Sequence, residues 1–350
     1  MQVDCHAPMG SLNTFGIAAI ARYRVVLPRP ASLADFQCDP RFRDLPRLIL
    51  GGGSNILLRD DFDGVVVQPG WSGWRVSGET ATHWLIDAGA GQSWHALVRE
   101  TIARGYAGLE NLSLIPGTVG AAPIQNIGAY GLELEARFDH LDAFDLFTGE
   151  TRRFGHAECE FGYRDSVFKR AERDRWMITS VTLRLPKMPD WRIDYAGLRD
   201  VLGGAAGEPL TARRISDAVC DLRRSKLPDP AVLGNAGSFF QNPVVSGERF
   251  RTLQARTPAL AGYPQPDGGF KLSAAWLIEQ CGWKGHRSGD AGVSSQHALV
   301  LVNHGAAKGA ELWRLAQRII VSVEARFGVR LEPEPRVVPA VERTDGAVAR

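Results

Sequence analysis

Short apolar runs bounded by glycine dominate the first half of the chain. The segments RLILGGGSNILL, GVVVQPG and HWLIDAGAG are rich in leucine or β-branched residues and contain or adjoin glycine, which is typical of short strands. Further on, LDAFDLFTGETRRF predicts a hairpin that turns at Gly149, and WMITSVTLRLP (Trp176–Pro186) predicts a strand closed by proline. The first half is therefore expected to consist mainly of strands.

Four segments carry apolar residues at the spacing of an amphipathic helix. In SWHALVRETIARGYAG the expected cap is Ser93 and the expected stop is Gly105. The other three lie beyond about residue 189, and they are TARRISDAVCDLRRSKLPDP, capped by Thr211, LSAAWLIEQCG, capped by Ser273, and GAELWRLAQRIIVSVEARFG. Between the last two, HALVLVN predicts a fully buried strand. The pattern predicts an α+β protein with a boundary near residue 210.

Length and composition are those of a folded protein with two or three domains. Of the 350 residues, 44% are hydrophobic and 23% are charged, as is usual for globular proteins. The 41 basic and 39 acidic side chains leave a formal charge of +2, so no overall field attracts nucleic acid or an anionic membrane. We expect a monomer without either partner, in which any anionic ligand meets a local basic cluster.

Cysteine and histidine spacing argues against a metal. The five cysteines are odd in number and none is in C-x-x-C spacing, and the eight histidines show no H-E-x-x-H pattern, so neither a disulfide framework nor a metal motif is indicated. The N-terminal segment has an acid at Asp4 and lacks the apolar core of a signal peptide. No run approaches the roughly 18 apolar residues that span a bilayer. These features predict a cytoplasmic protein without a metal.

Two glycine-rich stretches could approach a ligand closely. In LILGGGSNILL, three glycines, Ser54 and Asn55 follow a strand, which lets backbone N–H groups reach a pyrophosphate. Another extended run follows instead of a helix, so the stretch is neither a Walker nor a Rossmann loop, and a tight turn remains an alternative. GAGQSW lacks the last glycine of a dinucleotide fingerprint and is interpreted as the turn before a helix.

The second stretch, IPGTVGAAPIQNIGAYG (residues 115–131), holds four glycines and almost no charge. We expect it to form neither a well-packed helix nor a strand, and it is too apolar for a solvated loop. A flat, mostly apolar ring system with polar edges, such as a flavin, would fill the space against it.

The stretch GNAGSFFQNP places the hydroxyl of Ser238 between glycine and two phenylalanines. A hydrolase nucleophile elbow requires G-x-S-x-G, and Phe240 stands at the second glycine, so that chemistry is excluded. Ser238 is then either the start of an ordinary strand, with its hydroxyl bonded to the backbone, or a group with another chemical role.

Seven ordered motifs carry a resemblance to a known family. GGGSNILL, IPGTVGAAPIQNIGAYG, YRDSVFK, RRSKLPDP, GNAGSFFQNP, EQCGWKG and LEPEPR, spread from about Asn13 to Arg336, resemble the UDP-N-acetylenolpyruvoylglucosamine reductase (MurB) family. The segment around Tyr195 and DPAVLGNAGSFF favour its type I branch. The resemblance implies that NADPH reduces non-covalently bound FAD, and that UDP-N-acetylglucosamine enolpyruvate is then reduced to UDP-N-acetylmuramate for peptidoglycan synthesis.

The resemblance also implies a domain organisation. It predicts an FAD-binding domain of the vanillyl-alcohol-oxidase (PCMH) type in two α+β subdomains, residues 1–70 and 71–210. An α+β substrate-binding domain follows at 211–336, and the tail 337–350 could pack on the first subdomain, although its last dozen residues are expected to be loose.

Site residues are carried over where the motifs match. The expected catalytic residues are Ser238 as proton donor, Arg164 and Glu334. The family usually has valine after this glutamate, so Pro335 is a departure and Glu332 the fallback. The expected cofactor-binding residues are Gly51, Gly52, Gly53, Ser54, Asn55, Pro116, Gly117, Thr118, Gly120, Ala121, Ile124, Gly128 and Arg223. The expected substrate-binding residues are Tyr130, Tyr195, Lys226 and Asn242.

Alternatives stay open for single residues and for the whole chain. Without the motifs, Arg164 would be a surface arginine paired with Asp165, Tyr195 an amphipathic anchor, and residues 221–230 a solvated basic face. A flavin oxidase on the same fold would consume oxygen rapidly once reduced. An inactive UDP-sugar or nucleotide binder is disfavoured because Ser238, Arg164 and Glu334 are all retained.

Overall fold

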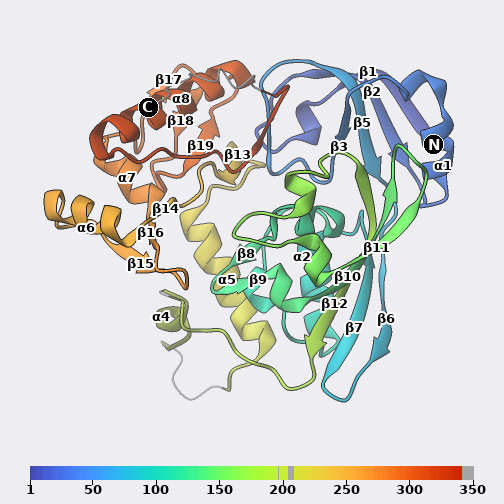
Figure 1. Cartoon of the computed structure of the whole chain (residues 1–350), viewed down its shortest axis with the longest axis horizontal. Coiled ribbons are helices and arrows are strands. Elements are labelled where there is room, and N and C mark those ends of the chain that lie inside the picture. The colour runs from blue at the N-terminus through green and yellow to red at the C-terminus, as the bar shows by residue number, and fades with distance from the viewer. Residues whose placement is uncertain (196, 204–208, 341–350) are drawn as a thin grey trace. The chain divides into compact units, whose positions relative to one another are not determined.

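The computed structural model describes residues 1–195, 197–203 and 209–340, and Figure 1 shows the course of the chain. It forms two compact units. The first comprises residues 1–7, 21–53 and 63–226, and the second comprises residues 8–20, 54–62 and 227–350. The three predicted domains stay a prediction. Of the predicted tail, residues 341–350 lie outside the described residues.

The first unit contains a four-stranded sheet in the order β1-β2-β5-β3. Its strands are β1 (Gln2–Pro8), β2 (Ile20–Leu27), β5 (Phe62–Pro69) and β3 (Arg47–Ile49), and β3 runs parallel to β5. Helix α1 (Ser32–Cys38) contributes Leu33 and Phe36 to a core with Val25, Val65 and Phe42. Strand β3 ends immediately before the first glycine-rich stretch, so this sheet fixes where that loop begins.

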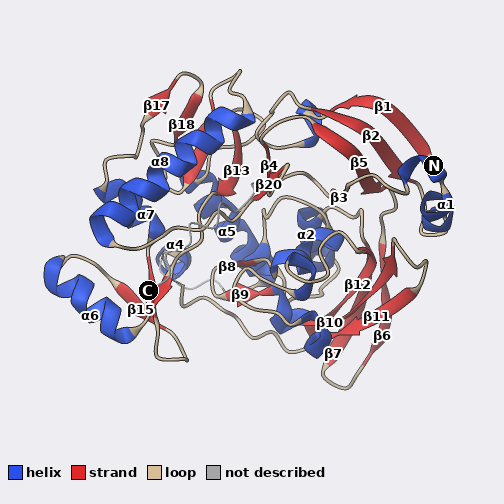
Figure 2. Cartoon of the chain, turned by 45° about the horizontal axis from the view of Figure 1, so that its top comes forward, coloured by secondary structure: helices blue, strands red, loops and turns tan. Residues whose placement is uncertain are grey.

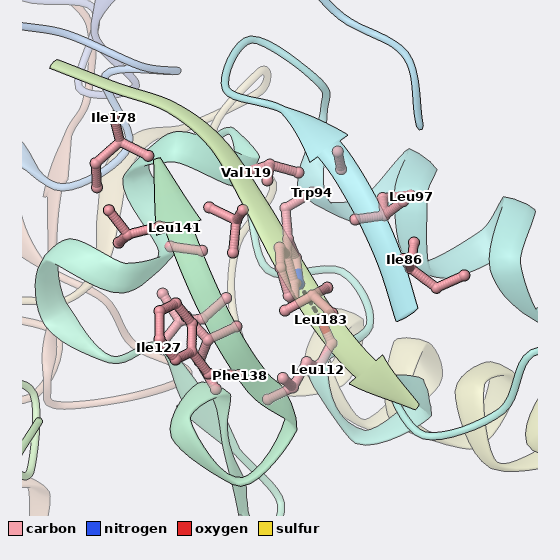
Figure 3. Packing of buried hydrophobic residues seen from close by; sticks show 14 of the residues in the cluster. Ile86, Trp94, Leu97, Leu112, Val119, Ile127, Phe138, Leu141, Ile178 and Leu183 are labelled. Carbon is pink, nitrogen blue, oxygen red and sulfur yellow. Dashed lines mark hydrogen bonds between the residues drawn. The ribbon is translucent and has the colours of Figure 1, made fainter. Parts of the chain in front are cut away.

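A five-stranded antiparallel sheet and helix α2 (Trp94–Ala103) form the main core of the first unit. The sheet order is β11 (Thr151–Gly155), β10 (Phe138–Asp145), β12 (Trp176–Pro186), β7 (His83–Gly89) and β6 (Trp74–Glu79). Figure 3 shows Trp94 and Leu97 of α2 gathered with Ile86, Leu141 and Leu183 of the strands. The indole N–H of Trp94 donates to the Leu112 carbonyl at 3.0 Å, so this buried ring leaves no unpaired donor.

The first unit is completed by smaller elements. Helix α5 (Ala212–Lys226) packs with α4 (Leu198–Gly203) and α2, and α3 (His156–Cys159) follows β11. The segment 115–131 forms a 3₁₀ helix, η4 (Val119–Gln125), and the short strand β8 (Gly128–Ala129), which pairs with β9 (Leu132–Glu133). The expectation that this stretch forms neither a well-packed helix nor a strand was therefore wrong in part, because a short 3₁₀ helix and a two-residue strand do form.

The second unit is built on a four-stranded antiparallel sheet in the order β13-β19-β18-β17. The strands are β13 (Gly234–Ser238), β19 (Val300–Asn303), β18 (Ala291–Val293) and β17 (Arg287–Ser288). Helix α8 (Gly309–Phe327) packs on β18 and β19, and Figure 2 shows it beside β18. Smaller parts are the sheet β14 (Val244–Val245), β16 (Phe270–Leu272), β15 (Gly262–Pro264), helices α6 (Gly247–Arg256) and α7 (Ala274–Gln280), and the parallel pair β20 (Arg336–Val338) and β4 (Ile56–Leu58).

The periodic segments adopt the predicted elements. Ser93, Thr211 and Ser273 accept backbone hydrogen bonds at the starts of α2, α5 and α7, and α8 ends at Gly328, whose φ is 63°. The hairpin β10–β11 and the buried strand β19 are confirmed. Among the described residues, no helix is long and apolar enough to cross a membrane.

Candidate active site

The two glycine-rich loops pack directly against each other in the first unit. A Cβ atom built on Gly51 would lie 2.6 Å from Oγ1 of Thr118, and one on Gly52 would lie 2.9 Å from Cα of Gly117. Both distances are shorter than a side chain tolerates, so the contact requires glycine at these positions. Gly53, with a φ of 62°, needs glycine for its left-handed backbone.

The second loop is also fixed by the turn before α2. The amide of Val119 donates to the Gln92 carbonyl at 2.8 Å, and the amide of Gly120 donates to the Ala90 carbonyl at 2.9 Å. A Cβ on Gly120 would lie 2.6 Å from Cβ of Ala90. The stretch GAGQSW, predicted to be only a turn, therefore also supports the candidate cofactor loop.

The Thr118 hydroxyl has an unusual environment. Its Oγ1 is buried and has no hydrogen-bond partner within the described structure. A buried hydroxyl without a partner costs about 1–3 kcal/mol, and proteins rarely retain that cost without a ligand or water to satisfy the group. Thr118 thus offers a donor and an acceptor beside the glycines.

Arg164 lies in a tight turn and contacts the second loop. Two backbone hydrogen bonds of 3.1 Å between Gly162 and Asp165 close the turn, and Arg164 has a φ of 55°. Its side chain is only 18% exposed, and Nη2 donates to the Gly128 carbonyl at 2.5 Å. The alternative of a surface pair with Asp165 was wrong, because Asp165 pairs with Arg170 instead.

Arg223 is the inward-facing member of the basic cluster at the end of α5. Its Nε donates to the Leu114 carbonyl at 3.2 Å. Burial lowers the pKa of this guanidinium, and the positive charge of Arg164 lowers it further. Tyr130 and the Cys220 thiol act in the opposite direction and raise the pKa. The solvated-face alternative was therefore wrong for Arg223, whereas Arg224 and the predicted substrate ligand Lys226 are exposed.

The two predicted substrate tyrosines lie against each other. The Tyr130 and Tyr195 rings meet edge to face with centroids 5.2 Å apart. Burial raises the pKa of Tyr130, Arg223 opposes the shift, and Tyr195 reinforces it. The buried Asn111 amide donates to the carbonyls of Tyr130 at 2.8 Å and Arg192 at 2.6 Å, which joins the two tyrosine-bearing segments.

In the second unit, Ser238 is the last residue of strand β13 rather than the first of a new strand. It pairs with Val300 of β19, after a register shift that begins at Asn235. The Asn235 side chain accepts from the Gly237 amide at 2.9 Å, and Gly237 has a φ of 68°. Within the described part of its own unit, the Ser238 hydroxyl has no hydrogen-bond partner, so it is not bonded to the backbone there.

Glu334 lies on the segment beside Ser238. Its amide donates to the carbonyl of Phe239 at 2.9 Å, next to the bridge between Phe240 and Pro333. Glu334 is in a bend before β20. The fallback, Glu332, is exposed and accepts the Gln241 amide at its carbonyl.

Two further predicted residues of the second unit, Asn242 and Asn55, have structural contacts. Oδ1 of Asn242 accepts the Ala274 amide at 2.9 Å at the start of α7. The carbonyl of Asn55 accepts the Arg336 amide at 3.0 Å. Ser54 and Asn55 belong to the second unit, whereas Gly51–Gly53 belong to the first. Arg164 also belongs to the first unit, and Ser238 and Glu334 belong to the second.

Comparisons with known proteins give matches to both parts of the chain. Residues 25–154 match an FAD binding domain, and residues 229–338 match the C-terminal domain of UDP-N-acetylenolpyruvoylglucosamine reductase. The reductase of that name from Burkholderia vietnamiensis is 54% identical over 94% of this chain and 95% of its own length. The chain belongs to the UDP-N-acetylenolpyruvoylglucosamine reductase family. A relative from Burkholderia lata is 53% identical over the same shares.

A solved structure of the family supports the fold. UDP-N-acetylenolpyruvylglucosamine reductase from Thermus caldophilus is 24% identical, covers 97% of this chain and 100% of its own, and has a TM-score of 0.68. The predicted family and α+β fold class, with a flavin-binding part and a C-terminal domain, are confirmed.

The residues present fit FAD. Glycines that leave no space for a Cβ atom bring two backbone segments together, and the Thr118 hydroxyl between them is buried without a partner in the described structure. A flat cofactor with polar edges would supply the hydrogen-bond partner that this hydroxyl lacks. The loops Gly51–Gly53 and 116–121 are the residues that would hold it.

Three residues of the site region were missed by sequence reasoning. The sequence assigned no role to Asn111, His95 or Asn126. Buried asparagines and a histidine carry no local periodic signal, because their partners are distant in sequence. Only the position of Asn126 between glycines, in the left-handed conformation that asparagine tolerates, could have indicated it.

Proposed function

We propose that this protein catalyses the NADPH-dependent reduction of UDP-N-acetylglucosamine enolpyruvate to UDP-N-acetylmuramate, with FAD as cofactor. The observation that carries the proposal is identity of 54% to a reductase of that name over 94% of the chain. The interlocked glycine loops support the cofactor independently of that name, because their geometry requires glycine at Gly51 and Gly52.

FAD, held by the loops Gly51–Gly53 and 116–121, would supply hydride-transfer chemistry between NADPH and the carbon–carbon double bond of the substrate. The reduction is completed by a proton, and we assign its source to the Ser238 hydroxyl. A hydroxyl is a weak acid, but the carbon next to the substrate carboxylate becomes strongly basic in this reaction and can take a proton from a well-placed group. The Ser238 hydroxyl has no hydrogen bond to the backbone within the described part of its own unit. It can therefore donate its proton to the substrate.

Arg164 is assigned to the negative charge that develops on the substrate carboxylate. A guanidinium that is largely shielded from water and fixed by a carbonyl contact is preorganised to stabilise such charge. Both features apply to Arg164, which is 18% exposed and bonded to Gly128. Glu334 is assigned as the third catalytic residue, beside Ser238 through its bond to Phe239.

Other residues are proposed to bind the ligands. Arg223 and Lys226 at the C-terminal end of α5 supply the local positive charge that a nucleotide diphosphate needs. Tyr130, Tyr195 and Asn242 contact the substrate, and the tyrosine pair offers a stacking or edge contact to it. We also propose that the protein acts as a monomer in the cytoplasm without nucleic-acid or membrane partners. Size-exclusion chromatography coupled to light scattering tests the first point.

The assignment is tested by measuring the two half-reactions separately in stopped flow. In Ser238→Ala, bleaching of the flavin by NADPH should keep the wild-type rate, whereas reoxidation by the enolpyruvyl substrate should fall about 10²–10⁴-fold, the usual contribution of a proton donor. Ser77→Ala removes an exposed hydroxyl from β6 and serves as the control.

The possible failures are distinguishable. A wild-type protein that neither contains nor takes up FAD, or that does not oxidise NADPH when the substrate is present, would refute the function as a whole. Normal rates of both half-reactions in Ser238→Ala would refute only the proton-donor assignment.

A further inference from the structure

Asn126 occupies a special position at the end of η4. It is fully buried, and its backbone is left-handed, with φ 44° and ψ 65°. Tyr130 and Arg164 nearby in the site also have positive φ values, 48° and 55°. Such conformations cost energy in residues other than glycine and persist only where surrounding contacts hold them. Asparagine tolerates this conformation better than most residues.

The Asn126 side chain joins three segments of the first unit. Nδ2 lies 3.1 Å from the Gly162 carbonyl and 3.1 Å from carboxylate oxygens of Glu133 and Glu135, and Oδ1 accepts the Glu135 amide at 3.0 Å. Three acceptors around Nδ2 and one donor at Oδ1 fix which way the amide points. An amide, and no carboxylate, satisfies this arrangement.

The same segments contact both ends of Arg164. Asn126 binds the carbonyl of Gly162, which begins the turn that carries Arg164. The Arg164 guanidinium binds Gly128, two residues after Asn126, and its Nη1 lies 3.9 Å from Oε1 of Glu133. The other oxygen of that carboxylate accepts from Asn126. Asn126 is therefore bonded both to the backbone turn that carries Arg164 and to the Glu133 carboxylate, which lies near the Arg164 guanidinium.

Two further contacts hold the turn, but neither reaches the guanidinium end. The Ser166 hydroxyl donates to the Ile124 carbonyl at 2.7 Å, and Nζ of Lys169 donates to the Arg164 carbonyl at 2.9 Å. Both act on the backbone. Asn126 differs because its side-chain amide bonds to both the turn and the Glu133 carboxylate.

We propose that Asn126 is a positioning residue, whose side-chain amide fixes the Gly162–Asp165 turn and the Glu133 carboxylate and thereby sets the direction of the Arg164 guanidinium. The inference rests on the proposed function, in which Arg164 acts on the substrate and has no part in flavin reduction. Loss of the amide should therefore affect the step that uses the substrate selectively. A residue that only supports the fold would not produce that selectivity.

The test uses two variants of the full holoenzyme. Asn126→Asp has the same shape but places a carboxylate against two carboxylates and a carbonyl, and Asn126→Gly keeps the left-handed backbone without the side chain. In both we expect flavin reoxidation by UDP-N-acetylglucosamine enolpyruvate to slow roughly 10²-fold, as for a catalytic group misplaced by about 1 Å. NADPH reduction and the flavin spectrum should be unchanged.

Equilibrium binding gives a readout that does not depend on turnover. Titration of the oxidised enzyme with the substrate, followed by flavin absorbance, should show about tenfold weaker binding, corresponding to the loss of one charge-assisted hydrogen bond. Asn13→Asp is the matched control, since Asn13 is also a buried amide that donates to two carbonyls, those of Met9 and Ile17. It should lower the unfolding temperature without slowing one half-reaction selectively.

Each outcome decides the proposal. Wild-type reoxidation rates in both variants, or equal slowing of both half-reactions with loss of FAD, would overturn the positioning role. If Asn126→Asp does not fold, Asn126→Gly alone decides between these results. A wild-type protein without substrate-dependent NADPH oxidation would overturn the proposed function itself, and this inference with it.

Discussion

The guanidinium of Arg164 donates to the backbone carbonyl of Gly128 over 2.5 Å. The bond connects a turn at residues 162–165 to the second glycine-rich stretch, residues 115–131, whose residues 116–121 are assigned to FAD. A Cβ on Gly128 would lie 2.7 Å from Nη1 of Arg164, so glycine is required for this approach. The residue assigned to the substrate carboxylate and the loop assigned to the cofactor are thus physically coupled within one unit.

Arg164→Lys should reveal this coupling. A lysine ammonium is a point charge without the planar fork of arginine, so it cannot bond Gly128 and present a second donor pair in the same geometry. We expect reoxidation by the substrate to fall about 10²–10³-fold, as on removal of one preorganised donor, with NADPH reduction unchanged in stopped flow. Arg170→Lys, an exposed arginine paired with Asp165, is the control. Equal losses in the two variants would contradict the role of Arg164.

Gly52→Ala should weaken FAD binding. The added methyl would lie 2.9 Å from Cα of Gly117, and because that neighbour is backbone, the two loops must separate. Overpacking of this kind costs about 1–3 kcal/mol, which corresponds to roughly 5- to 150-fold weaker binding. Fluorescence titration of the apoprotein with FAD measures it. Gly78→Ala, where the methyl would make an ordinary 3.5 Å contact with Leu85, should bind FAD like the wild type.

Local sequence patterns were sufficient to predict most regular elements but few of the contacts within the site. Strand β12 has the predicted bounds, Trp176–Pro186, because β-branched residues and a closing proline are local signals. The partner of Arg164 is 36 residues away and that of His95 is 19 residues away. No periodicity encodes such pairs, since they arise only when the sheet and loops assemble.

The motifs of the family identified candidate site residues, and the geometry explains why some of these positions hold the residue types they do. Gly51 and Gly52 are needed because another loop fills the space of their side chains, which the interpretation as a simple tight turn did not foresee. Ser238 was an isolated hydroxyl in sequence, and its position at the end of β13 after a register shift became evident only in the structure.

Pro335→Val should leave activity close to wild type. Proline lacks an N–H group, but the amides on both sides are bonded, Glu334 to Phe239 at 2.9 Å and Arg336 to Asn55 at 3.0 Å. The backbone at Glu334 is thus held independently of residue 335. Steady-state kcat and KM test this, with Glu334→Gln as the contrasting variant, in which kcat should fall about 10²-fold or more. A large loss in Pro335→Val would show that proline itself orients Glu334.

His95 should make folding sensitive to mild acid. Its Nδ1 accepts the Leu114 amide at 2.8 Å. Only the neutral ring that carries its proton on Nε2 can accept this hydrogen bond. Leu114 has a φ of 58° and precedes the second glycine-rich loop. Burial lowers the pKa of His95, and the positive charges of Arg99, Arg224 and Arg223 add to the shift.

The sign of the pH effect follows from that lowered pKa. The unfolded chain binds a proton at His95 near its ordinary pKa of about 6.5, before the folded protein does, so stability is fully present above that pH and decreases as the pH falls below it. His95→Asn can place Oδ1 near the position of Nδ1 and does not titrate. Urea unfolding of both proteins from pH 7.5 to 5 measures this effect. As the pH falls, the free energy of unfolding of the wild type should decrease more than that of the variant, by up to the value of one hydrogen bond, about 0.5–1.5 kcal/mol. If the difference in the free energy of unfolding between the two proteins stays constant with pH, His95 is not the titrating group.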